Sequence, residues 1–175
     1  MEQWDIYDID RNKTDRTMVR GDEFAEGDYH VVVHICIFNS RGEMLIQQRQ
    51  PFKEGWSNMW DFSVGGSAIK GDDSQTAASR ELFEELGYER NLKGIRPHFT
   101  MNFKDGFDDF YFIEDDVDIS RLKLQYTEVA RVKWATRDEI KQLINEKKFI
   151  PYYESLIDFI FDTYKQYGTH KGENF

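Results

Sequence analysis

The pattern of apolar and polar positions predicts a strand-rich first half of the chain. Residues 30–38, HVVVHICIF, form an apolar run rich in β-branched side chains, which predicts a buried central strand. Residues 44–49, MLIQQR, follow the turn-like NSRGE, so the two segments are expected to form a hairpin. A further strand is predicted at 4–9, and the polar residues 10–29 are expected to be loop-rich.

Strands and helices alternate in the remainder. A short strand over 60–64 leads into a glycine loop, and a helix is expected at about 74–86. Further strands are predicted at His98 to Phe103, Phe110 to Glu114 and Val129 to Trp134, with helices at Thr136 to Glu146 and Tyr153 to Tyr167. This order predicts an α/β fold. A mixed sheet is expected, because the first strand pair is an antiparallel hairpin whereas the helix at 74–86 connects more distant strands.

The predicted helix at 74–86 carries three glutamates close together. Glu81, Glu84 and Glu85 have i, i+3 and i, i+4 spacing, so their carboxylates are expected on one side of the helix. At an effective dielectric of about 20 and a separation of about 6 Å, each like-charge pair costs roughly 3 kcal/mol. Gly87 suits a C-terminal cap, and the helix dipole disfavours negative charge in the turn before it. The arrangement would therefore destabilise an isolated helix.

A divalent cation would reverse both effects. Mg²⁺ or Mn²⁺ prefers carboxylate oxygens and would neutralise the cluster. The alternative is a solvated acidic helix face, which is the usual explanation of a charge run. Three glycines precede the helix at loop spacing, at positions 65, 66 and 71. Arg80 lies four residues before Glu84 and can orient its carboxylate. These neighbours favour the metal site.

The acidic helix is part of a longer pattern. The segment from Gly66 to Tyr88 resembles the Nudix box, G-x5-E-x7-R-E-U-x-E-E-x-G-U, in which U is apolar. The matching positions are Gly66, Arg80, Glu81, Leu82, Glu84, Glu85, Gly87 and Tyr88. Asp72 stands where the family has Glu, and its shorter side chain can reach a metal through water. Asp72, together with Asp73 and Ser74, also suits the N-cap of the helix.

The resemblance implies both a fold and a set of site residues. The fold would be the Nudix fold, a mixed β-sheet sandwiched between helices, and the cofactor Mg²⁺ or Mn²⁺. The implied metal ligands are Glu81, Glu84, Glu85 and Asp72. The candidate catalytic residues are Glu85, Glu84, Arg80 and Glu128, with Glu85 or Glu128 as the base. The candidate substrate-binding residues are Arg49, Gly65 and Gly66. Arg49 is equally suited to a structural ion pair.

The implied reaction is metal-dependent pyrophosphate hydrolysis. Water would attack phosphorus in a nucleoside diphosphate linked to another group, or in a related diphosphate. The expected partner is thus a small phosphorylated substrate. A formal net charge of −10 argues against binding to a nucleic acid polymer, whose affinity comes largely from basic residues. No apolar run approaches the length of a membrane span, so no membrane partner is expected.

Chain length and cysteine usage bear on domain organisation and location. The 175 residues suit a single Nudix domain, with a core at about 30–146, an N-terminal extension over 1–29 and a C-terminal helix at about 153–167. That last helix is apolar enough to dock on the sheet or on a second copy in a homodimer. One cysteine, Cys36, lies in an apolar run, and the N-terminus lacks the pattern of a signal peptide. The expected location is the cytoplasm.

Two other functions remain open. The segments HVVVHICIFNSRGEMLIQQR and WDFSVGG are also similar to isopentenyl diphosphate isomerase, which shares the Nudix fold. That enzyme uses a cysteine just before the box region, where this chain has Gly65, whereas hydrolysis needs only the carboxylates. The second alternative is a sensor that binds a nucleotide without turnover. It is favoured by Asp72 and disfavoured by the presence of all three glutamates.

Overall fold

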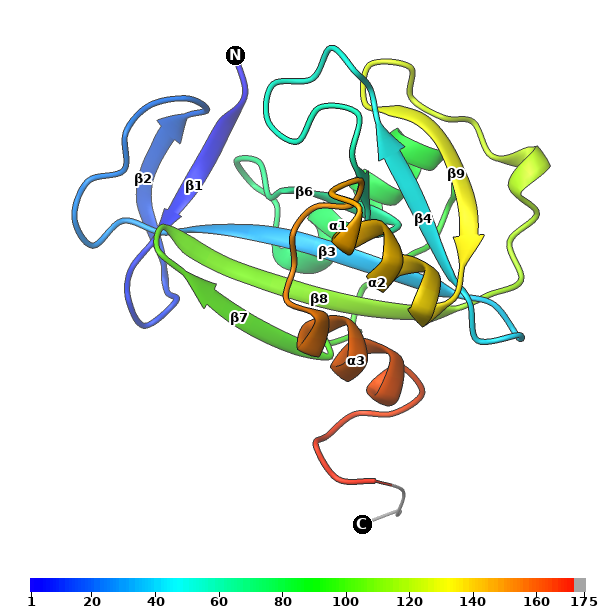
Figure 1. The fold of residues 1–175 in the computed structure, drawn as a ribbon. Coiled ribbons are helices and arrows are strands. Elements are labelled where there is room, and N and C mark those ends of the chain that lie inside the picture. Colours follow the sequence, from blue (N-terminus) through cyan, green and yellow to red (C-terminus); the bar gives the residue numbers. More distant parts are fainter. Residues whose placement is uncertain (172–175) are drawn as a thin grey trace. The chain divides into compact units, whose positions relative to one another are not determined.

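Residues 1–171 are described by a computed structural model, in which they form nine strands, three α-helices and one 3-10 helix (Figure 1). The strands are β1 (Gln3–Tyr7), β2 (Lys13–Val19), β3 (His30–Phe38), β4 (Met44–Arg49), β5 (Trp60–Asp61), β6 (Val64–Ser67), β7 (Phe99–Phe103), β8 (Gly106–Glu114) and β9 (Val129–Ala135). The helices are α1 (Ser74–Leu86), η1 (Ile119–Arg121), α2 (Arg137–Asn145) and α3 (Glu154–Thr163). This alternation confirms the α/β class.

Seven of the strands belong to one hydrogen-bonded sheet. Its order is β5-β4-β3-β8-β7, with β6 paired to β3 and β9 paired to β4, while β1 and β2 pair separately. The predicted hairpin is present, with Phe38 opposite Met44 in an antiparallel pair. An isolated bridge between Trp60 and Phe149 is parallel. The mixed sheet expected from the sequence is confirmed.

The chain divides into two compact units. The first comprises Met1–Ile35, Val64–Tyr111 and Leu122–Gln125, and the second comprises Cys36–Ser63, Phe112–Arg121 and the chain from Tyr126 onward. Strands β3 and β8 contribute residues to both units. The organisation as a single domain stays a prediction. Among residues 1–171, no helix combines the length and hydropathy that crossing a bilayer requires.

Helix α1 belongs to the core of the first unit. Helix α1 contacts β6 and buries one face, formed by Ala77, Ala78, Leu82 and Leu86. These positions recur at the helical period, so their burial follows from the amphipathic pattern. Helix α1 is thereby packed along its length, and the residues on its other faces are available for a site.

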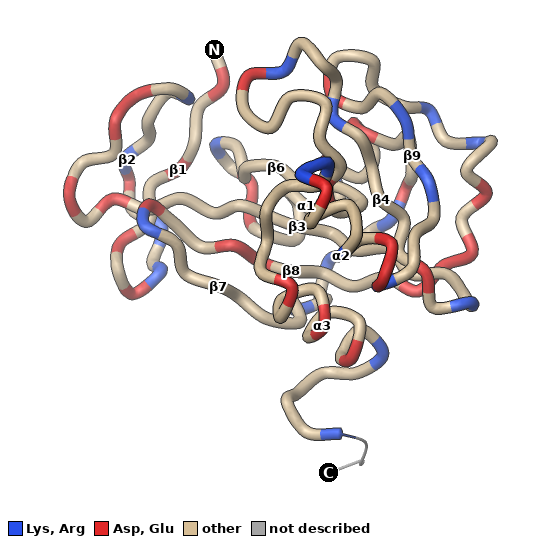
Figure 2. Tube along the Cα trace, in the orientation of Figure 1, with Lys and Arg blue, Asp and Glu red and all other residues tan. Residues whose placement is uncertain are grey.

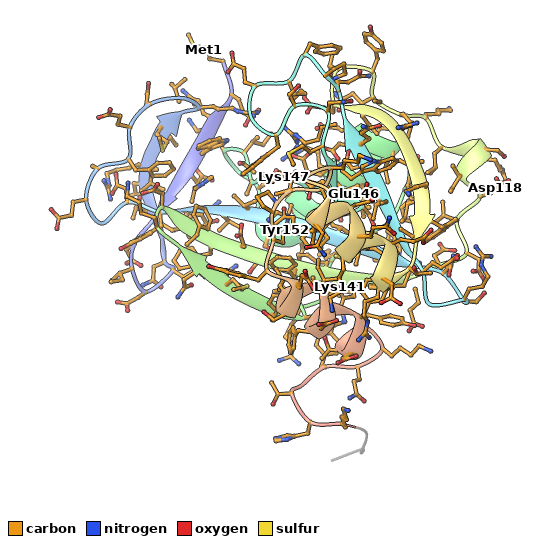
Figure 3. The ribbon with its side chains drawn as sticks, in the orientation of Figure 1. Met1, Asp118, Lys141, Glu146, Lys147 and Tyr152 are labelled. Atoms are coloured by element: carbon orange, nitrogen blue, oxygen red, sulfur yellow. The ribbon has the colours of Figure 1, made fainter. Side chains whose placement is uncertain are left out.

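The second unit has an aromatic core. Phe62 lies in ring contact with both Phe149 and Tyr152. Helices α2 and α3 are joined by ion pairs such as that of Lys141 with Asp158, at 2.7 Å. Figure 3 labels the Lys141 side chain on α2. Basic positions recur along β9 (Figure 2), and its Arg131 and Lys133 both lie over the Trp60 ring.

Three predicted elements differ from the structure. Residues 10–29 were expected to be loop-rich, but Lys13–Val19 form β2 and pair with β1. The predicted strand over 60–64 is divided into β5 and β6. The last helix is shorter than expected and ends at Thr163. The β2 segment was missed because its strand is stabilised by pairing with β1, whereas its polar composition resembles a loop.

Candidate active site

Helix α1 begins and ends where its sequence predicts. Asp73 is the N-cap, and its side chain accepts a hydrogen bond from the Thr76 N–H at 2.8 Å. Gly87 is the C-cap with a left-handed φ of 63°, and its N–H donates to the Phe83 carbonyl at 2.8 Å. Asp72 is therefore not the residue that caps the helix, and its carboxylate is free for another role in the site.

The first glycine of the Nudix box makes room for a glutamate. Gly66 lies on β6 opposite Val33 of β3. A Cβ atom at position 66 would overlap the carboxylate of Glu81. At Gly65, a Cβ atom would lie 3.2 Å from His34 Nδ1. The absence of a side chain at position 66 thus allows the Glu81 carboxylate to lie against the strand backbone.

Arg80 lies at the centre of the carboxylate group. Its Nε donates to Asp72 Oδ2 at 3.0 Å, and its Nη1 donates to Glu81 Oε1 at 2.8 Å and to Glu84 Oε2 at 3.0 Å. Its Nη2 donates to the Ser67 carbonyl at 3.0 Å. One guanidinium therefore fixes three carboxylates and the end of β6, as its fork of donors permits. The expected contact of Arg80 with Glu84 is therefore present, and Arg80 also contacts Asp72 and Glu81.

Burial changes the protonation of the group. Burial raises the pKa of Glu81 to about 7, although the nearby Arg80 lowers it in part, and the negative charge of Glu84 raises it further. For Arg80, burial by itself would lower the pKa, but Glu81 and Asp72 outweigh this effect and raise it. Three acidic groups and one base leave an excess of negative charge, because one guanidinium neutralises one carboxylate.

The three helix glutamates differ in exposure. The Glu84 side chain is 46% exposed, and the Glu81 side chain is 13% exposed. Glu85 is buried beside Leu82 and Leu86 on the packed side of α1. Glu81 and Glu84 thus share Arg80 near the surface, while Glu85 lies deeper. The expectation that all three carboxylates project from one side of the helix stays a prediction.

The donor set suits a hard divalent cation. Asp72, Glu81 and Glu84 supply only carboxylate oxygens, the ligands that Mg²⁺ and Mn²⁺ prefer. Within residues 1–171, no three acidic, histidine or cysteine side chains are arranged around a common metal position. Arg80 instead holds the carboxylates that would serve as ligands. The residues therefore fit the metal by chemistry and charge, and binding would require these carboxylates to turn toward it.

The second unit holds the other two predicted site residues. Arg49 lies at the end of β4 opposite Val129 of β9, and its Nε is buried without a hydrogen-bond partner among the described residues. Glu128 forms an ion pair with Lys53, and its carbonyl accepts from the Gln50 N–H at 3.0 Å. The structure thus brings Arg49 and Glu128 close together within this unit. Lys53 was not predicted, because nothing in its local sequence signals the partner.

The first unit also contains site neighbours that the sequence did not indicate. Asp5 of β1 and Lys13 of β2 contact the loop that carries Asp72. Their segment was expected to be an edge strand and a loop. The sequence of residues 13–19, KTDRTMV, has no apolar–polar alternation that would have indicated a strand. The contact of Lys13 with Asp72 joins positions 59 apart, so no local pattern predicts it.

Comparison with known proteins identifies the class. The model of the NUDIX domain family matches residues 28–155. The chain is 48% identical over 153 residues to a Nudix hydrolase of Listeria monocytogenes, covering 87% of this chain and 90% of the relative. It therefore belongs to the Nudix family, whose members generally use a divalent metal. Within that family it is a hydrolase.

Two further proteins extend the comparison. An isopentenyl-diphosphate Delta-isomerase of Pectobacterium atrosepticum is 27% identical over 145 residues, covering 77% of each chain. A crystal structure of a Deinococcus radiodurans protein superimposes with a TM-score of 0.73 at 22% identity, covering 90% of this chain and 98% of that chain. The structural likeness confirms the Nudix fold.

Proposed function

We propose that this chain is a Mg²⁺- or Mn²⁺-dependent pyrophosphohydrolase. Its substrate would be a nucleoside diphosphate linked to another group, or a related diphosphate, attacked by water at phosphorus. The observation that carries this proposal is the gathering of Asp72, Glu81 and Glu84 around Arg80, which leaves uncompensated negative charge beside a buried Glu85. A cation at this position offsets the like-charge repulsion.

Each residue of the group has a distinct role in this proposal. Glu81, Glu84 and Glu85 hold the metal, and Asp72 supports it directly or through water. When bound, the metal lowers the pKa of its water and offsets charge on the phosphates. Arg80 keeps the carboxylates oriented before the metal arrives. Glu85 or Glu128 accepts the proton of the attacking water.

The proposed substrate-binding residues are Arg49, Gly65 and Gly66. Arg49 has an Nε without a hydrogen-bond partner in the described chain, so its guanidinium has donor capacity for a phosphate oxygen. Lys53 lies beside Glu128 and holds its carboxylate. Gly65 and Gly66 present backbone without side chains, which permits close approach of a ligand. The partner is thus a small phosphorylated molecule, not a nucleic acid polymer or a membrane.

The isomerase alternative lacks its acid. Gly65 stands where the related isomerase would have a cysteine, and the lone Cys36 is fully buried. Burial raises the pKa of the Cys36 thiol well above its ordinary value, which disfavours the thiolate. The similarity to the Pectobacterium isomerase nevertheless justifies including isopentenyl diphosphate among the tested substrates.

Cellular setting and assembly belong to the same proposal. The protein would act in the cytoplasm, where its single cysteine stays reduced. A homodimer would use the face of α3, whose Phe159 is 36% exposed.

The decisive experiment is turnover on a panel of substrates. Nucleotide sugars, dinucleotides, nucleoside di- and triphosphates and isopentenyl diphosphate would be incubated with Mg²⁺ or with EDTA in ¹⁸O-labelled water. Mg²⁺-dependent cleavage with ¹⁸O in one phosphate product is the expected result. Binding without cleavage throughout the panel would instead favour the sensor. Deuterium uptake at carbon of isopentenyl diphosphate in D₂O would favour the isomerase.

A further inference from the structure

The N-terminal β-hairpin contacts the loop that leads into α1. Strands β1 and β2 lie before residue 28, where the match to the family model begins. The Lys70 N–H donates to the Gln3 carbonyl at 2.7 Å, which joins the loop to β1 by its backbone. The hairpin is therefore an addition to the matched domain that contacts the box itself.

Two charged side chains of the hairpin fix the next loop residues. Asp5 Oδ2 accepts hydrogen bonds from the Gly71 N–H at 2.7 Å and from Lys13 Nζ at 2.8 Å. Lys13 Nζ also donates to the Asp72 carbonyl at 3.1 Å. Gly71 has a φ of 92°, a conformation that other residues rarely adopt. Asp5 and Lys13 thus hold both ends of the Gly71–Asp72 unit.

The contact continues from this loop into the carboxylate group. Asp72 is bonded through its backbone to Lys13 and through its side chain to Arg80, at 3.1 and 3.0 Å. Arg80 in turn bonds Glu81 and Glu84. A shift of the loop would therefore move the Asp72 carboxylate away from Arg80 and change the orientation of both glutamates.

We infer that Asp5 and Lys13 are positioning residues of the metal site, which hold the 70–72 loop so that Asp72 and Arg80 keep the carboxylates ready for a divalent cation. The inference rests on the proposed function and extends it to a segment outside the family match. Neither residue is a proposed ligand of the metal. Their effect is transmitted through the loop backbone.

The hairpin has other anchors, so the role can be tested without detaching it. Arg11 forms an ion pair with Asp109, and Trp4 stacks on His30 with ring centroids 4.5 Å apart. These contacts do not involve the loop at 70–72. Substitution of Asp5 or Lys13 is therefore expected to leave the hairpin docked.

The test compares Asp5→Asn and Lys13→Met with the parent in full-length protein. The dissociation constant for Mn²⁺ is expected to rise by about 10- to 100-fold, the range known for residues that support metal ligands. The Gly71 amide is expected to exchange with solvent faster. With substrate, kcat/KM should fall at low Mn²⁺ and recover at high Mn²⁺, and Lys13→Arg should restore much of the affinity.

Arg16→Gln is the matched control. Arg16 lies on β2 and pairs with Asp28, which lies beyond the hairpin, and no hydrogen bond or ion pair joins Arg16 to the 70–72 loop among the described residues. An unchanged Mn²⁺ dissociation constant in Asp5→Asn and Lys13→Met, with normal binding in the parent, would overturn this inference alone. Failure of the parent to bind Mn²⁺ would overturn the proposed function as well. A shift equal to that of Arg16→Gln would mean that the hairpin acts only on stability.

Discussion

Two arginine-centred groups in the first unit differ in their charge balance. Arg11 pairs with Asp109, whose carboxylate is fully buried and also accepts hydrogen bonds from Ser74 and Thr100. There, one acid meets one base and two hydroxyl groups. Arg80 instead meets Asp72, Glu81 and Glu84, so acids exceed bases.

This difference in charge balance is what we expect between a structural group and the metal-binding group proposed above. Asp109 has its hydrogen-bonding capacity filled by donors of the protein, as a buried carboxylate requires. The Arg80 group has more negative charge than the protein compensates, which favours binding of a cation. The number of ion pairs does not distinguish the two groups. The balance of charge within each group does.

The first unit also contains a buried histidine, His30, which differs from both arginine-centred groups. His30 is packed by aromatic rings, and its Nδ1 has no hydrogen-bond partner among residues 1–171. The surrounding rings belong to Trp4, Phe24 and Phe103. Burial lowers the pKa of His30 to about 4, although Asp108 and Asp105 oppose this. His30 therefore stays neutral and avoids the need for a counter-ion.

The largest effect is expected on removing charge from the unbalanced group. Glu84→Gln should lower Mg²⁺-dependent kcat/KM by about 100-fold or more, because a metal contributes several kcal/mol to transition-state stabilisation. The metal-free variant should be as stable as the parent or more stable, since a like charge is removed. Turnover assays and urea unfolding in EDTA would measure both. The control is Glu89→Gln, at an exposed position just beyond the box. If metal-free Glu84→Gln were less stable than the metal-free parent, Glu84 would have a structural role instead.

Removing charge from the balanced group should act on stability. Asp109→Asn is expected to lower the free energy of unfolding by about 3 kcal/mol, because it leaves Arg11 without its counter-ion and the neighbouring hydroxyls with a poorer acceptor. Urea unfolding with and without Mg²⁺ would measure the loss. Asp105→Asn, whose side chain is 36% exposed, should change the value by less than about 0.5 kcal/mol. Equal effects of the two variants would contradict the comparison.

Lowering the pH should reduce the free energy of unfolding through His30. As pH falls below 6.5, His30 takes up a proton in the unfolded chain, whereas in the folded protein it stays neutral down to a pKa of about 4. The free energy of unfolding should therefore fall with pH over this interval, with a contribution from His30 of about 3 kcal/mol at most. His30→Phe should flatten that part of the stability curve.

Urea unfolding at a series of pH values is the measurement for His30. His98, whose pKa is also lowered to about 4 by burial, contributes with the same sign, so part of the slope should remain. His170→Gln, at an exposed position, should leave the curve unchanged. A His30→Phe curve with the same slope as the parent between pH 6.5 and 4 would refute the assignment of His30 as a neutral buried group.

The helix cap provides a smaller, separate effect. Asp73→Ala should destabilise the protein by about 1 kcal/mol, because the Thr76 N–H loses its acceptor. Metal affinity should be almost unchanged, since Asp73 is not bonded to Arg80. Thermal unfolding and Mn²⁺ titration would separate the two properties. A loss of metal binding larger than the loss of stability would place Asp73 in the site.

The smallest effect is expected where charge is conserved. Asp72→Glu should keep kcat/KM within about threefold of the parent or raise it, because the longer side chain still reaches Arg80 and can contact the metal directly. Steady-state kinetics over a range of Mg²⁺ concentrations would test this. A large loss of activity with normal stability would mean that the 70–72 loop tolerates only the shorter carboxylate.

Local signals in the sequence predicted much of α1 and of the site. The helix was expected over 74–86, and the structure has Ser74–Leu86. The helix begins after an Asp that caps its first turn and ends at a Gly that adopts a left-handed conformation. Both signals are local, so the ends of the helix can be predicted from the amino-acid sequence. The spacing of Arg80, Glu81 and Glu84 also lies within two helical turns, which made their proximity predictable.

Contacts between distant segments required the tertiary structure. Arg11 and Asp109 are 98 positions apart, and no periodicity connects them. Only the fold shows that Gly66 must lack a side chain because Glu81 lies against it. The hydrogen bonds of Asp5 and Lys13 with the 70–72 loop likewise depend on strand register. The sequence by itself determined the acidic helix and its family, since both depend on local spacing; the tertiary structure decided which charges are balanced, because pairing partners are brought together only by packing.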